Sequence, residues 1–131
     1  MGVIVGTSPS FIRPSQDFIK EDTLNFIKQN YESGNFDKLP PTPIVRKDGD
    51  GNYIAIDGHN LLAFYSLKGL DCDVYVANSD TDVLEGSSDM VAKRNKDLKE
   101  KYDSALKEAD LLASRGIKTI ADLCGFAKVR L

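Results

Sequence analysis

The sequence predicts an α/β (α+β) domain in which a sheet is covered by helices, followed by a C-terminal helical hairpin. Short apolar runs bounded by glycine and proline alternate along the chain with segments of helical spacing. Their order is strand, helix, strand, strand, helix, strand and then two helices. Of the 131 residues, 41% are apolar and 28% are charged, as in ordinary globular domains.

The first strand and helix are predicted in the N-terminal quarter of the chain. Residues 3–5 form a short apolar run that leads into the turn-rich stretch 6–10, which indicates a strand. From Glu21 onward the apolar residues follow helical spacing, and Gly34 is a natural end for that helix.

A β-hairpin follows. Three prolines between residues 40 and 43 keep the chain extended, because each biases the preceding residue away from helical angles. The apolar runs 44–46 and 53–56 are separated by the glycine-rich stretch 47–52. This pattern is typical of two antiparallel strands joined by a turn.

The spacing then becomes helical. Residues 61–68 are predicted to form a helix closed by Gly69, and residues 72–77 the final strand. Two cysteines, Cys72 and Cys124, lack C-x-x-C spacing. With a single histidine in the chain they cannot form the usual four-ligand zinc site, so we interpret them as small buried apolar residues.

The C-terminal part is predicted to be helical. Residues 78–88 are acidic and contain Gly and Ser, so we divide the chain into an α/β domain at 1–79 and an acidic linker with a helical extension at 80–131. Residues 89–115 carry an apolar stripe, and a short second helix begins after Thr119, its expected N-cap. The stripe either packs on the domain or serves as the surface for a protein partner or self-association through 89–115.

Charge and hydropathy limit the classes of partner. The net charge of −3 gives no general attraction to nucleic acid or to an anionic membrane, so nucleic acid is the less favoured partner. The basic run from Lys93 to Lys101 has acids among its lysines, and we interpret it as the solvated face of a long helix. No apolar run approaches about 18 residues, so we expect no membrane partner and a cytoplasmic protein.

The most informative stretch is Asp57-Gly58-His59-Asn60, which contains the only histidine. A strand that ends in a tight turn and enters a helix directs free N–H groups, and the positive end of the helix dipole, at whatever lies in front. Gly58 would allow a ligand to approach the backbone closely. Alternatively, Asp57 is only the N-cap of the helix. The residues alone leave both interpretations open.

A family resemblance bears on this choice. IRPSQDFIKEDTLNFIKQNYESG is similar to the opening loop and first helix of the ParB/sulfiredoxin-like superfamily. LPPTPIVRKDGDGNYIAIDGHNLLAFYSLKGLDCDVYVAN is similar to its central pattern, with a DGHHR-like loop between strand and helix. The resemblance covers about half of the chain, residues 12–77, and implies a mixed sheet with helices.

The resemblance also implies a ligand, namely a nucleotide (ATP, ADP or CTP) with Mg²⁺ or another phosphate-containing small molecule. Carried over by position, Gly58, His59 and Asn60 would contact phosphate, and Asp57 would hold the metal ion or act as a general base. The implied reaction is phosphoryl transfer or nucleotide hydrolysis, with Asp57 and His59 as catalytic residues.

Other positions of the pattern match less well. Arg13 and Gln16 lie in the matching opening loop and are expected beside the nucleotide, but the phosphate-gripping arginine of the family is Leu61 here. Leucine cannot replace the charge and paired donors of a guanidinium. The catalytic cysteine of sulfiredoxins falls at His59, which excludes sulfinic-acid reductase chemistry.

Two other classes of function stay open. The missing arginine favours a non-catalytic protein-interaction module that descends from such a domain. The superfamily also contains DNA-binding proteins and nucleases, and a shared fold does not decide among these activities.

Overall fold

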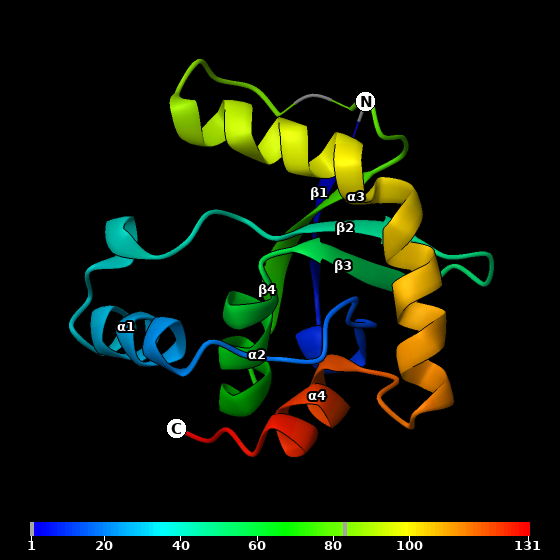
Figure 1. The fold of residues 1–131 in the computed structure, drawn as a ribbon. Helices are drawn as coiled ribbons and strands as arrows, with labels where there is room; N and C mark the ends of the chain where they lie inside the picture. Colours follow the sequence, from blue (N-terminus) through cyan, green and yellow to red (C-terminus); the bar gives the residue numbers. More distant parts are fainter. Residues whose placement is uncertain (1, 83) are drawn as a thin grey trace.

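Four strands form a mixed sheet in the computed structural model, which describes residues 2–82 and 84–131 (Figure 1). The spatial order is β1-β4-β2-β3. The strands are β1 (Val3–Thr7), β2 (Ile44–Lys47), β3 (Tyr53–Asp57) and β4 (Cys72–Ala77). β2 runs parallel to β4, whereas the β1–β4 and β2–β3 pairs are antiparallel. The α/β (α+β) class and the β2–β3 hairpin are confirmed.

Helices cover both faces of this sheet. The helices are α1 (Glu21–Glu32), α2 (His59–Lys68), α3 (Asp89–Ser114) and α4 (Ile120–Ala127), with short 3-10 turns η1 (Pro9–Phe11) and η2 (Phe36–Lys38). α2 packs between α1 and α4, and α3 packs on β3. In the described part of the chain, no helix combines the length and the apolar character needed to cross a bilayer.

The two faces of the sheet follow from strand alternation, since successive side chains point to opposite sides. On β4, Val74 and Val76 join the core under α2 and α4, whereas Tyr75 and Ala77 join the core under α3. On β3, Ala55 and Ile54 divide in the same way. The central residues of β3 and β4 are therefore buried on both faces of the sheet, whereas β1 at its edge is largely exposed.

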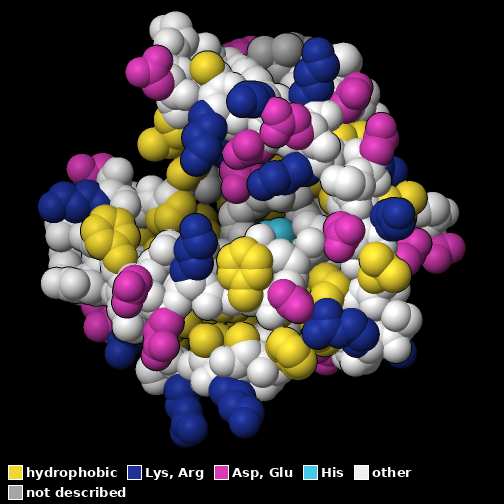
Figure 2. All heavy atoms as spheres, in the orientation of Figure 1, with side chains coloured by type: hydrophobic (Ala, Val, Ile, Leu, Met, Phe, Trp, Pro, Cys, Tyr) yellow, Lys and Arg dark blue, Asp and Glu magenta, His cyan; other side chains and the backbone are white. Residues whose placement is uncertain are grey.

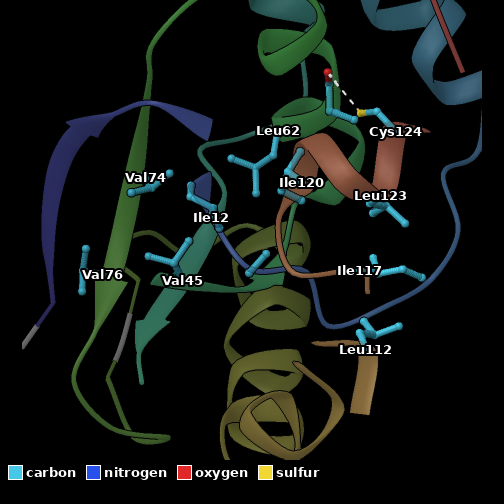
Figure 3. Close-up of a cluster of buried hydrophobic side chains, with 12 residues drawn as sticks. Ile12, Val45, Leu62, Val74, Val76, Leu112, Ile117, Ile120, Leu123 and Cys124 are labelled. Carbon is cyan, nitrogen blue, oxygen red and sulfur yellow. Dashed lines mark hydrogen bonds between the residues drawn. The ribbon is translucent and has the colours of Figure 1, made fainter. Parts of the chain in front are cut away.

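The C-terminal helices contribute to the same core as the N-terminal part. Figure 3 shows Ile120, Leu123 and Cys124 of α4 gathered near Ile12 and Leu62, and all five belong to one buried cluster. Residues after 80 therefore bury apolar surface together with residues before 79.

The predicted helical hairpin is wrong in its packing. α3 lies on β3 whereas α4 lies on α2 and η1, so the two helices do not pack along each other. The reason lies in the connecting turn, where the Ile120 N–H donates to the Ile12 carbonyl at 2.7 Å and ties the start of α4 to η1. Thr119 caps α4 as predicted, since its Oγ1 accepts from the Asp122 N–H at 3.1 Å.

The apolar stripe of α3 is largely buried within the chain. Leu98, Ala105, Ala109 and Leu112 all pack into the domain. Asn95, the polar residue in the stripe, holds the preceding segment, because its Oδ1 accepts from the Leu84 N–H at 2.8 Å. Most of the stripe therefore packs on the domain, which was the first of the two interpretations given for it.

α3 bends near its middle, as Figure 1 shows. Arg46 of β2 contacts this region, donating from Nη1 to the Tyr102 carbonyl at 2.9 Å and stacking over the Tyr102 ring at 4.2 Å. A side chain that binds a helical carbonyl competes with the hydrogen bond of the helix itself, which is a known cause of bends.

The turn between β3 and α2 has no room for a side chain. Gly58 has φ of +96°, and a Cβ there would lie 2.7 Å from Pro43 Cβ and 2.9 Å from Pro43 Cα. We predicted that Gly58 leaves space for a ligand, but the neighbour that approaches it closely is Pro43. This contact holds the turn against the extended segment that precedes β2.

Gly58→Ala is expected to lower the free energy of unfolding by about 3 kcal/mol, because left-handed strain and the clash with Pro43 add. Gly69→Ala is the matched control: Gly69 also has positive φ, +69°, but nothing lies within 4 Å of its Cβ position. There we expect only about 1 kcal/mol. Urea denaturation of both variants measures the difference, and equal losses would contradict the role of Pro43.

Candidate functional site

A pocket of about 350 Å³ lies in front of the first turn of α2. Five of the six predicted site residues line it, namely Gln16, Asp57, Gly58, His59 and Asn60. Figure 2 shows the single histidine at the bottom of a hollow on this face of the molecule. The volume lies at the lower end of the range for small-molecule sites.

The first turn of α2 presents free backbone donors to this pocket. Within the described residues, the N–H groups of His59, Asn60 and Leu61 have no hydrogen-bond partner, as is normal for the first turn of a helix. Gly58 occupies the N-cap position and no side chain caps the helix. The interpretation of Asp57 as the N-cap is therefore wrong.

Asp57 is instead paired with α3. Its Oδ2 lies 3.3 Å from Nε of Arg94, and Nη2 of the same guanidinium donates to the Thr42 carbonyl. Arg94 thus joins α3 both to the end of β3 and to the segment before β2. The carboxylate that we expected to cap the helix anchors the long helix instead.

His59 is the most buried polar side chain of the pocket, with 4% of its surface exposed. Its Nε2 accepts from the Ser15 N–H at 3.0 Å. Because Nε2 is an acceptor, the neutral ring carries its proton on Nδ1. Within the described residues Nδ1 has no hydrogen-bond partner. The ring therefore has one donor available to the pocket.

Burial also keeps this ring neutral. It lowers the pKa of His59 to about 4, with Lys101 acting in the same direction and Asp57 opposing it. At neutral pH the side chain is a neutral hydrogen-bond donor.

Asn60 and Gln16 shape the rim of the pocket. Asn60 Oδ1 accepts from the Lys20 N–H at 2.9 Å, and Gln16 Nε2 donates to the Phe18 carbonyl at 3.0 Å. Asn60 therefore holds the opening loop against the start of α2, whereas Gln16 stabilises the loop itself.

Arg13 is not among the residues that line the pocket. Its guanidinium lies 2.9 Å from Asp48 Oδ2 and 2.7 Å from Asp110 Oδ1. Asp48 also accepts from the N–H groups of Asp50 and Asn52 in the hairpin turn. Arg13 thus connects that turn to α3, and the structure does not bring it together with the other predicted residues.

Three lysines line the pocket that we did not predict as site residues: Lys20, Lys93 and Lys101. Lys93 and Lys101 come from the basic run that we interpreted as a solvated helix face. They are eight residues apart, with Asp97 midway, and this spacing places all three on one side of a helix. The spacing could be read from the sequence, but the sequence did not show that this side of α3 faces the start of α2.

The lining offers few free carboxylates for the predicted Mg²⁺. Mg²⁺ in nucleotide sites is usually held by one or two carboxylates together with phosphate oxygens. Of the two acids in the lining, Asp57 is paired with Arg94. The other, Asp97, lies midway in sequence between Lys93 and Lys101, which line the same pocket. Among the described residues, no group of three or more His, Cys, Asp or Glu side chains is placed to hold a metal ion.

The depressed pKa of His59 predicts a loss of stability in acid. The unfolded state binds a proton near pH 6.5 and the folded state only near 4, so the contribution is complete above 6.5 and is lost as the pH falls toward 4. His59→Gln keeps an acceptor for the Ser15 N–H but does not titrate. Between pH 7 and pH 5 the native protein should lose about 2 kcal/mol more than this variant in chemical denaturation. Parallel losses would show that His59 is not buried in neutral form.

No family model matches the chain, and no curated protein matches it. Among solved structures, the chain is similar to protein Atu1540 from Agrobacterium tumefaciens, with 11% sequence identity and a TM-score of 0.43. The match covers 88% of this chain and 48% of that one, so the chain spans about half the length of that protein. At this level of similarity neither family nor function is transferred.

Proposed function

We propose that this domain binds the phosphate groups of a nucleotide, or of another phosphorylated small molecule of the cytoplasm, in front of α2. The observation that carries the proposal is the state of His59. Its ring is almost entirely buried, its Nε2 is fixed by Ser15, and its Nδ1–H remains without a partner in the described residues beside the free amides of α2. Because no buried side-chain nitrogen or oxygen among the described residues lacks a hydrogen-bond partner, the unpartnered Nδ1 lies open to the pocket, where a ligand can reach it.

The available groups suit a phosphate oxygen. The amides of the first helical turn and the Nδ1–H of His59 are all donors, and the helix dipole adds positive potential at the same place. None of these donors needs to ionise before it can bind. A phosphate would therefore accept several hydrogen bonds from groups that are already fixed in position.

The geometry supports binding more directly than catalysis. With its proton on Nδ1 and Nε2 engaged by Ser15, His59 offers no free basic nitrogen at neutral pH. Asp57 would have to leave Arg94 before it could act as a general base. Phosphoryl transfer and nucleotide hydrolysis are the reactions to test once binding is established.

Calorimetric titration with ATP, ADP and CTP tests the proposal, in parallel with and without magnesium. The native chain should bind at least one of these nucleotides. His59→Gln retains the acceptor near the position of Nε2 but loses the Nδ1 donor, so its affinity should fall about tenfold.

His59→Asn is the matched control for this titration. Its side-chain amide lies near the position of Nδ1 and can still donate, so its affinity should fall less than that of His59→Gln. Circular dichroism first establishes that both variants are folded. If the folded native chain gives no heat with any of the three nucleotides, the proposal is wrong.

A further inference from the structure

We infer that Lys20, Lys93 and Lys101 bind the phosphate chain of a diphosphate or longer ligand directly, in place of a divalent cation. This inference rests on the proposed function and specifies the chemistry of the same site. Two of the three lysines come from α3, which lies beyond the stretch of family resemblance.

The lysines reach the pocket from two sides. Lys93 and Lys101 lie on one side of α3, about two helical turns apart, and Asp97 lies midway between them. Lys20 lies at the N-cap position of α1, in the loop that Asn60 holds against α2. None of the three forms an ion pair within residues 2–82 and 84–131. Their ammonium groups are therefore available to an anionic ligand.

The charge balance of the lining favours an anion. Asp57 and Arg94 neutralise each other, which leaves three ammonium groups against the single carboxylate of Asp97. A cation approaching the same place would meet this excess of positive charge. The charge that a magnesium ion supplies in other nucleotide sites is here supplied by the chain itself.

The arrangement points to more than one phosphate. The free amides of α2 and the Nδ1–H of His59 belong to one short stretch of the lining and can hold one phosphate group. The lysines come from other parts of the lining, α3 and the loop before α1, and a second phosphate can bind to them. Lysine acts as a compact charge rather than a planar fork, so it suits a flexible phosphate chain.

The experiment compares inorganic pyrophosphate, ADP and orthophosphate by calorimetric titration of the full chain, once in EDTA and once with excess Mg²⁺. Pyrophosphate and ADP should bind in EDTA at least as tightly as with Mg²⁺, and both at least tenfold more tightly than orthophosphate. The ratio of ADP to pyrophosphate affinity distinguishes a nucleoside diphosphate from an inorganic one.

Variants on α3 test the role of the lysines. Lys93→Met and Lys101→Met should each weaken pyrophosphate binding about tenfold in EDTA. Lys101→Arg keeps the positive charge and should retain most of the native affinity for pyrophosphate. Lys99→Met is the matched control, because Lys99 is an exposed lysine of the same helix that does not line the pocket.

The outcomes separate the two proposals. Binding that appears only with Mg²⁺, or lysine variants that behave like Lys99→Met, would overturn this inference and leave the proposed function standing. Equal affinity for orthophosphate and pyrophosphate would overturn the diphosphate assignment. An absence of binding for all ligands in both buffers would overturn the proposed function and this inference with it.

Discussion

The position of α3 over the pocket depends on the guanidinium of Arg94. It contacts Asp57 at the end of β3 and the Thr42 carbonyl before β2, so one side chain joins three segments that are distant in sequence. The pair is partly buried, with side-chain exposures of 12% for Arg94 and 35% for Asp57. Removing one member would leave the other partly desolvated without its counter-charge, which costs more than the intact pair contributes. Because Lys93 is adjacent to Arg94 in sequence, the same contact also sets where the lysines of α3 lie.

The turn that carries the site is fixed from three directions. Pro43 fills the space beside Gly58, Ser15 holds the ring of His59, and Arg94 holds Asp57. β3 also has an irregular register just before this turn, where Ile56 falls between the paired positions of Ala55 and Asp57. Such irregularities change the direction of the following residues. The donors of the pocket are thus held in fixed positions, an arrangement that would lower the entropy cost of binding the proposed ligand.

Most of the helices and strands could be predicted from strand alternation and helical spacing in the sequence. The predicted bounds of β4 agree with the structure at both ends. The observed α2 differs from the predicted helix only in beginning at His59 rather than at residue 61. The packing of α4 was not predictable, because it depends on a hydrogen bond to Ile12 across the chain. Similarly, Arg13 was expected in the site by its place in a loop, but Asp48 and Asp110 bind it elsewhere. Long-range charge pairing of this kind leaves no local pattern in a sequence.

The most instructive residue is Leu61, which stands where the resemblance predicts an arginine. Its side chain is 5% exposed, packs with Leu24, Ile27 and Phe64 and also lines the pocket, so an arginine there would start from an apolar cluster at the pocket's edge. Restoring the arginine would place a charge among these residues without a counter-charge from the cluster. The positive charge of the pocket comes instead from α3 and the opening loop. The absence of an arginine at this position therefore does not leave the lining without positive charge, since the charge depends on where side chains meet and not on which segment supplies them.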